Sequence, residues 1–153
     1  MDLSFETIVL AVGPQDDDRL DRLAQAVLQV AKPTDATVVL THVFTQEQFE
    51  NVAAEIDLPN ATTEDVNTVL KRHQSVRRLE RLLEEHDVDY DLRGVVGDVS
   101  DGIVSLAGET NADRVVVSGA TRSPVGKAMF GSTTQDVLLG APCPVTYVRS
   151  PAE

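Results

Sequence analysis

Residues 113–134, DRVVVSGATRSPVGKAMFGSTT, decide the fold of this chain of 153 residues. The first part is a short run of valines that ends in Ser118 and Gly119, which predicts a strand buried on both faces of a parallel sheet. A glycine-bearing loop follows, and Ser132 with Gln135 has the spacing of a capping box at the start of a short helix. A buried strand, a loop and a helix in this order indicate an α/β protein.

The rest of the chain alternates strands and helices around this segment. Further strands are expected at residues 5–12, 36–43, 88–96 and 142–148, and helices at residues 20–33, 62–86, 98–112 and 132–139. Residues 45–60, with several acids and a proline, are expected to form an irregular or mobile insertion. The alternation predicts one domain over residues 1–153, a doubly wound five-stranded parallel sheet in the order 3-2-1-4-5.

This strand order also predicts where a ligand would bind. The chain reverses direction between the first and fourth strands, and ligands of such sheets lie in the crevice beyond the carboxyl ends of those strands. The residues expected at these strand ends are Ala11, Val12, Gly13, Val43, Ser118 and Gly119, and the loop up to Thr134 follows them.

The charge balance excludes some partners. Acidic residues outnumber basic ones by 25 to 13, a formal net charge of −12. Nucleic acids and anionic membranes need clustered cations, so neither is an expected partner. An acidic shell with few lysines suggests adaptation to a salt-rich cytoplasm, where screening shortens the range of self-repulsion. No long apolar run, signal peptide or pair of cysteines is visible, so a cytoplasmic protein is expected.

Two nucleotide motifs are absent. Six residues rather than four separate Gly119 from the Gly126-Lys127 pair, and Ala128 stands where a Walker motif needs Ser or Thr. The glycines after the third expected strand lack the G-x-G-x-x-G spacing of a dinucleotide-binding loop. Neither a Walker site nor hydride transfer is therefore expected.

The histidines and the cysteine are expected to be structural. His42, His73 and His86 lie on different elements, without the spacing of a metal or catalytic site. His73 falls on an apolar helical face and is expected in the core, whereas His42 is expected to be half-buried near a strand end. Cys143 stands between two prolines without a basic partner, which favours a packed residue over a nucleophile.

The loop after the fourth strand has the composition of an anion site. It combines two cations, flexible glycines and hydroxyls at a helix start: Arg122, Gly126, Lys127, Gly131, Ser132, Thr133 and Thr134. Free amides and hydroxyls at a helix N-terminus, beside cations, bind anions. An alternative remains open, in which Gly131 only makes a tight turn and Ser132 is only an N-cap.

At this loop the sequence resembles the universal stress protein family, and the likeness extends across nearly the whole chain. It rests on the strand IVLAV at residues 8–12, the ending THV at 41–43, the passage GDVSDGIVSLAGETNADRVVVSG at 97–119 and the closing GSTTQDVLLGAPCPVTYV at 131–148. Gly119, Gly131, Ser132 and Thr133 match the first glycine and the closing element of the family's phosphate-binding loop.

The resemblance implies an adenine-nucleotide-hydrolase-like fold and a cytoplasmic stress-response protein that binds ATP, with Mg²⁺ as a further candidate. It implies that Ala11, Val12 and Val43 line the base pocket and that the loop residues named above hold phosphates. It also implies a homodimer that forms through the last strand, Pro144 to Val148; an unpaired apolar edge strand is compatible with this.

Two departures from the family pattern support an alternative. Arg122 stands where the family has its second glycine, and Gly13 occupies the place of an aspartate that contacts the nucleoside. The alternative is a nucleotide-free dimeric module that acts through protein contacts. No general base, nucleophile or metal constellation is visible, so an enzyme is not expected beyond weak ATP hydrolysis.

Overall fold

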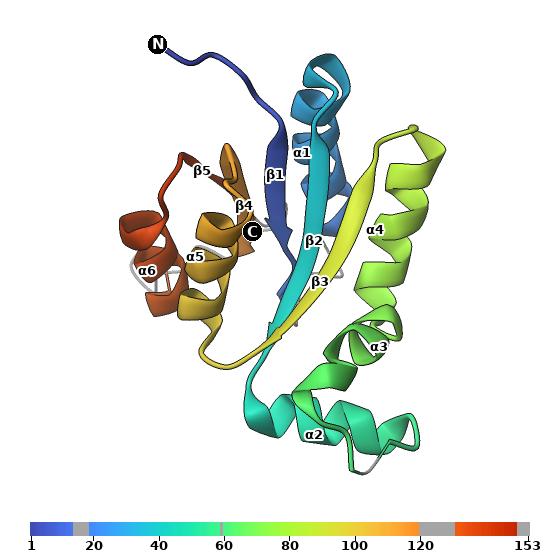
Figure 1. The fold of residues 1–153 in the computed structure, drawn as a ribbon. Coiled ribbons are helices and arrows are strands. Elements are labelled where there is room, and N and C mark those ends of the chain that lie inside the picture. The colour runs from blue at the N-terminus through green and yellow to red at the C-terminus, as the bar shows by residue number, and fades with distance from the viewer. Residues whose placement is uncertain (14–18, 59, 120–130, 150–153) are drawn as a thin grey trace, which may run out of the picture.

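The protein folds around one parallel sheet in the order β3-β2-β1-β4-β5 (Figure 1). The computed structural model describes residues 1–13, 19–58, 60–119 and 131–149. The strands are β1 (Thr7–Ala11), β2 (Thr37–Phe44), β3 (Tyr90–Val96), β4 (Arg114–Gly119) and β5 (Val145–Arg149). Every neighbouring pair is parallel. The doubly wound α/β fold and the strand order expected from the sequence are confirmed.

Helices cover both faces of the sheet. They are α1 (Leu20–Thr34), α2 (Gln46–Glu55), α3 (Val66–Lys71), α4 (Gln74–Glu85), α5 (Val99–Glu109) and α6 (Ser132–Gly140), and a 3₁₀ turn spans Thr63–Asp65. Figure 1 shows α5 and α6 together on one side, α1 and α4 on the other, and α2 beyond the carboxyl ends of β2 and β3. The two sets of helices lie on opposite faces because crossovers are right-handed and the chain moves one way across the sheet from β1 to β3 and the other way from β3 to β5.

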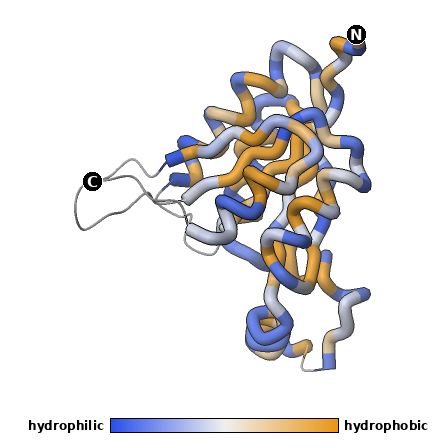
Figure 2. Tube along the Cα trace, turned by 90° about the vertical axis from the view of Figure 1, so that its left-hand side faces the viewer, coloured by the Kyte–Doolittle hydropathy of each residue, from blue (hydrophilic) through white to orange (hydrophobic). Residues whose placement is uncertain are grey.

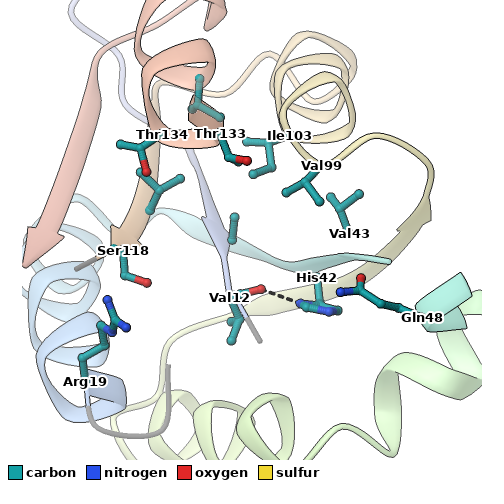
Figure 3. Close-up of a pocket in the computed structure, with 15 residues that line it drawn as sticks. Val12, Arg19, His42, Val43, Gln48, Val99, Ile103, Ser118, Thr133 and Thr134 are labelled. Carbon is teal, nitrogen blue, oxygen red and sulfur yellow. Dashed lines mark hydrogen bonds between the residues drawn. The ribbon is translucent and has the colours of Figure 1, made fainter. Parts of the chain in front are cut away.

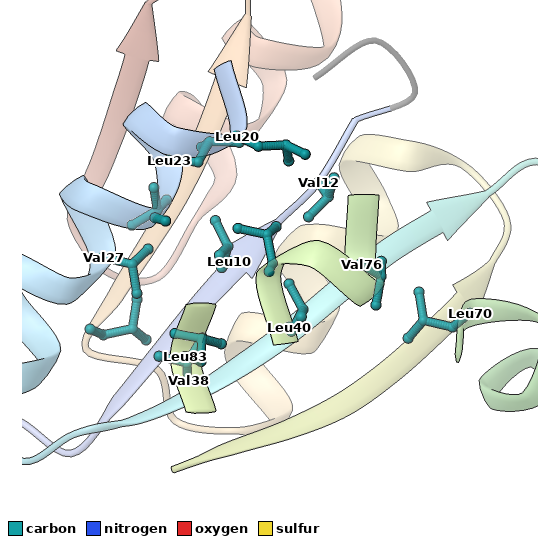
Figure 4. Packing of buried hydrophobic residues seen from close by; sticks show 14 of the residues in the cluster. Leu10, Val12, Leu20, Leu23, Val27, Val38, Leu40, Leu70, Val76 and Leu83 are labelled. Atoms are coloured by element: carbon teal, nitrogen blue, oxygen red, sulfur yellow. The ribbon is translucent and has the colours of Figure 1, made fainter. Parts of the chain in front are cut away.

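Two clusters of buried residues hold these layers together, and the hydrophobic stretches gather in the interior of the molecule (Figure 2). On the α1 and α4 face, Leu10 and Leu40 of the central strands pack with Leu23, Val76 and Leu83 (Figure 4). On the other face, alternate residues of the same strands pack against α5 and α6. Strands buried on both faces account for the continuous apolar runs in the sequence.

The expectation of an irregular segment at residues 45–60 was wrong, because most of it forms α2. Thr45 and Gln48 make a capping box: the Gln48 N–H donates to Thr45 Oγ1 at 3.2 Å, and the Thr45 N–H donates to Gln48 Oε1 at 3.0 Å. Phe49 and Ala53 are buried one helical turn apart and anchor this helix on the core. Acids on the exposed face concealed a helix that tertiary packing stabilises.

The expectation of a single helix over residues 62–86 was also wrong, because the chain forms two helices, α3 and α4, that are separated at His73. The expected capping contact does form, with the Thr62 N–H donating to the Asp65 carboxylate at 2.9 Å. At His73 the backbone turns extended, with ψ of 125°, and α4 starts at the next residue. This break lets α3 lie against β3, where the Gly94 N–H donates to Asn67 Oδ1 at 2.7 Å.

Two glycines of α5 give a matched test of helix–sheet packing. A Cβ at Gly102 would lie 2.9 Å from Val43 Cγ1 and 3.2 Å from Val95 Cγ1, whereas a Cβ at Gly108 meets nothing within 4 Å. Alanine favours a helix by up to about 1 kcal/mol over glycine, and overpacking costs about 1–3 kcal/mol. We therefore expect Gly108→Ala to stabilise the protein slightly and Gly102→Ala to destabilise it by about 1 kcal/mol.

Urea unfolding followed by circular dichroism measures both variants. Adding Val43→Ala to Gly102→Ala is expected to cost less than the sum of the two single changes, because it removes the crowding methyl groups. Equal effects of Gly102→Ala and Gly108→Ala would contradict this close contact between α5 and the sheet.

Candidate functional site

A pocket of about 380 Å³ lies at the carboxyl ends of β1, β2 and β4 (Figure 3). The described residues that line it are Ala11, Val12, Gly13, Arg19, His42, Val43, Gln48, Val99, Ile103, Val117, Ser118, Gly119, Thr133, Thr134 and Val137. They come from the ends of three strands, from the N-cap of α1, from the first turn of α2 and from the first two turns of α5 and α6. The pocket therefore occupies the switch point that the strand order predicts.

The two ends of the pocket differ in chemistry. At one end Val43, Val99 and Ile103 supply apolar surface, and the amide of Gln48 lies beyond them (Figure 3). At the other end lie the hydroxyls of Ser118 and Thr134 (Figure 3). One end thus suits a flat apolar group and the other suits a polar or anionic group.

Arg19 gives the polar end its positive charge. Its side chain lies just before the first residue of α1, only 8% of it is exposed, and Figure 3 shows its guanidinium extending toward Ser118. Among the described lining residues it is the only arginine or lysine, and no aspartate or glutamate is found among them. In a chain of net charge −12, a cation without a carboxylate beside it among the described lining residues favours an anionic ligand.

His42 forms part of the pocket wall and is more deeply buried than the half-buried position expected for it, with 4% exposed. Its Nδ1–H donates to the Val12 carbonyl at 2.5 Å, because a carbonyl only accepts. Its ring packs edge-on against Phe44 at 4.5 Å between centroids and tilted against His73 at 4.7 Å. These contacts fix the end of β1 relative to β2, so His42 has a structural role in the wall.

The structure brings together eight of the residues predicted from the sequence. These are Ala11, Val12, Gly13, Val43, Ser118, Gly119, Thr133 and Thr134. Gly131 and Ser132 are exposed and are not among the described lining residues. Arg122, Gly126 and Lys127 lie outside the described residues.

The proposed N-cap was misplaced by one residue. Gly131, not Ser132, is the N-cap of α6, and Ser132 is its first helical residue. Among the described residues, no side chain makes an N-cap hydrogen bond to this helix. Gly131 has φ of −66° and ψ of 162°, an ordinary extended conformation that lets the chain enter the helix directly. Within the described ranges, the first amides of α6 thus receive no bond from an N-cap side chain, and Thr133 and Thr134 place this turn at the edge of the pocket.

Seven lining residues were not predicted as site residues from the sequence. They are Arg19, His42, Gln48, Val99, Ile103, Val117 and Val137. Val99, Val117, Val137 and Ile103 fall within the expected strands and helices, and Arg19 follows three aspartates in a polar run. Gln48 lies on the helix that was not expected, although the Thr45–Gln48 spacing was a signal that could have revealed it.

Metal-ligating side chains do not cluster in the described part of the chain. Within residues 1–13, 19–58, 60–119 and 131–149, no three His, Cys, Asp or Glu side chains gather to hold a metal. In the same ranges, no helix is long and apolar enough to cross a membrane. Cys143 is half-buried among the residues that pack against α5 and α6, as expected for a structural residue.

Cys143 is expected to react slowly with alkylating agents. Burial, reinforced by the nearby Asp113 carboxylate, raises the pKa of its thiol, so the thiolate forms at higher pH than in an ordinary cysteine. We expect iodoacetamide to modify the folded protein at least about fivefold more slowly at pH 8 than the urea-unfolded chain. Mass spectrometry over a pH series measures this, and equal rates in both states would contradict it.

A doubly wound sheet with a pocket at its switch point defines the chain as an α/β protein of the class in which that edge of the sheet is the usual ligand position. The model of the universal stress protein family matches residues 4–149, and the chain belongs to that family. A universal stress protein of Mycolicibacterium smegmatis is 32% identical over 93 residues, which cover 59% of this chain and 72% of that protein.

Solved structures of universal stress proteins share the fold. One from Archaeoglobus fulgidus has a TM-score of 0.68 and 23% identity, covering 94% of this chain and 98% of that one. The Archaeoglobus fulgidus protein in complex with dAMP has a TM-score of 0.65 and 20% identity, covering 95% of this chain and 98% of that one. A universal stress protein in complex with cAMP has a TM-score of 0.61 and 21% identity, covering 96% of this chain and 98% of that one. At these identities the likeness shows the fold alone.

Proposed function

We propose that the pocket binds an adenine nucleotide, with ATP as the ligand. The observation that carries the proposal is the division of the pocket into an apolar end and a cationic, hydroxyl-bearing end. The base would lie near Val43, Val99 and Ile103, and the phosphates would lie near Gly119 and the start of α6. Two solved structures with this fold are complexes with dAMP and cAMP, which supports the same class of ligand here.

The helix ends suit phosphate groups. Thr133 and Thr134 lie in the first turn of α6, where amides and the positive end of the helix dipole attract anions. No carboxylate lies among the described lining residues, so a Mg²⁺ ion would reach the site on the phosphates. The composition of the loop supports further phosphate contacts, which we also propose: Arg122, Gly126, Lys127, Gly131 and Ser132.

Calorimetric titration of the purified protein with ATP and Mg²⁺ in high-potassium buffer tests the proposal, with mass spectrometry for co-purified nucleotide. Micromolar binding or a carried-over nucleotide is the expected result. A folded protein that binds no ATP up to millimolar concentration would overturn it and favour the nucleotide-free module. Steady ATP turnover abolished by changes in the pocket would show an enzyme instead of the binding module that we propose.

We further propose a homodimer that forms through β5. This strand ends the sheet beside β4, and Leu139 of the preceding helix is 87% exposed. An edge strand next to an exposed leucine offers both backbone groups and apolar surface to a second copy. Light scattering after size exclusion tests this, and a monomer at micromolar concentration would contradict it.

We also propose that the protein works in a salt-rich cytoplasm, which predicts stabilisation by salt. Screening of the net charge of −12 is expected to raise the Tm by about 5 °C or more between 0.1 and 2 M KCl at pH 7. The rise should be much smaller near pH 4.5, the isoelectric point, where little net charge remains to be screened. Thermal unfolding at both pH values measures this, and a Tm independent of KCl at pH 7 would contradict it.

A further inference from the structure

We infer that Arg19 binds the phosphate groups of the ligand from the α1 side of the pocket, opposite α6. The inference rests on the proposed function, which places an adenine nucleotide in this pocket. The residues that match the family's phosphate-binding loop lie around the start of α6, whereas Arg19 comes from a different part of the chain. The phosphates would then be held from both faces of the sheet.

Arg19 lies at the end of the pocket where the phosphates are proposed. The side chain lines the pocket and is 92% buried, and Figure 3 shows its guanidinium on the same side as Ser118 and below Thr134. Its charge also reaches the end of β5: burial raises the pKa of Tyr147, and the positive charges of Arg19 and Arg149 oppose that rise. Tyr147 lies against Gly119, because a Cβ there would be 2.9 Å from its hydroxyl. Arg19 is therefore close to the strand end where phosphates are proposed.

The electrostatic surroundings of Arg19 favour an anion beside it. Arg19 is the N-cap of α1, so its cation lies at the positive end of that helix, where a negative charge is favoured and a positive one is not. Burial adds a desolvation cost to a guanidinium. An anion at this end of the pocket would be attracted by both the guanidinium and the helix.

The guanidinium of Arg19 has the hydrogen-bond donors that a phosphate group needs. Its five N–H donors form a planar fork that fits phosphate oxygens, and the group keeps donors for other contacts while it binds. Ser118, on the neighbouring strand end, adds a hydroxyl beside it. The ligand selected in this way is a nucleoside phosphate and not a nucleoside.

The test measures the affinities of the wild type and three variants for ATP, adenosine and tripolyphosphate by calorimetry in one buffer. Arg19→Ala removes the group, Arg19→Lys keeps its charge without the fork, and Arg22→Ala removes an exposed arginine of the same helix that does not line the pocket. Tm values show that each variant is folded.

We expect Arg19→Ala to weaken ATP binding about 10- to 100-fold, toward the affinity for adenosine, since a charge-assisted bond to phosphate is lost. Arg19→Lys should recover part of the loss, and Arg22→Ala should bind ATP within about twofold of the wild type. Adenosine affinity should not change.

Other outcomes would overturn the inference in distinguishable ways. If the wild type binds ATP and Arg19→Ala binds it equally well, or loses ATP and adenosine alike, Arg19 does not bind phosphate and the proposed function stands. If the wild type binds tripolyphosphate through Arg19 but not ATP, the anion site stands and the proposed nucleotide function falls. If the wild type binds none of the three compounds, both are wrong.

Discussion

Replacing Leu40 by alanine is expected to lower the free energy of unfolding by about 3 kcal/mol, the usual size for a leucine deleted from a rigid core. Leu40 is fully buried on β2, the strand between β1 and β3, and it packs in the cluster under α1 and α4 (Figure 4). Strands on both sides prevent the backbone from closing the cavity that the missing atoms leave. The loss is a large fraction of the stability of a domain of this size.

The matched control is Leu3→Ala, because Leu3 is 81% exposed before β1 and loses the same atoms. It should change the free energy of unfolding by no more than about 0.5 kcal/mol. Urea titration at fixed protein concentration in KCl, followed by far-ultraviolet circular dichroism, measures both, since the chain has no tryptophan. Equal losses for the two variants would place Leu40 outside the core.

Gly119→Val is expected to weaken ATP binding at least about tenfold. A Cβ at Gly119 would lie 2.9 Å from the Tyr147 hydroxyl and 3.1 Å from Tyr147 Cε1, so either the ring or the end of β4 must move. Gly119 lines the pocket, and such a shift displaces the wall beside the proposed phosphates. Overpacking should also cost about 1–3 kcal/mol of stability.

A second change separates crowding from a direct role of the glycine. Tyr147→Phe removes the oxygen that the new Cβ would meet first, so the double variant should recover part of both losses. Calorimetry with ATP and urea unfolding of the two single variants and the double variant measure this. Wild-type ATP affinity in Gly119→Val would mean that the carboxyl end of β4 is not part of the site.

The sequence predicted the sheet well because strands buried on both faces leave unbroken apolar runs. The valines of β4 and of β2 defined central strands, and alternation with helices then allowed few strand orders. The polar alternation of residues 88–96 correctly indicated an edge strand, β3. Two predictions failed where local signals were weak. The helix α2 is mostly polar, and it is held on the core by Phe49 and Ala53. The chain breaks at His73 although the apolar stripe of residues 62–86 continues on both sides of the break.

Some residues of the candidate site could be predicted from the sequence, and others could not. Residues at strand ends, such as Val12, Val43 and Gly119, follow from the strand order, since carboxyl ends of parallel strands meet at one edge. No local pattern assigns Arg19 or Gln48 to the pocket, although the Thr45–Gln48 spacing marks the start of a helix. They line the pocket only because α1 starts beside β4 and α2 folds back beyond β2.

The sequence by itself determined the α/β class, the strand order and the edge at which a ligand would bind, because hydrophobic periodicity records which faces of each element are buried. Tertiary structure alone decided that a buried arginine lies at one end of the pocket and an amide at the other. Such neighbours are set by how whole helices pack across the sheet, and that packing depends on contacts between residues far apart in the chain.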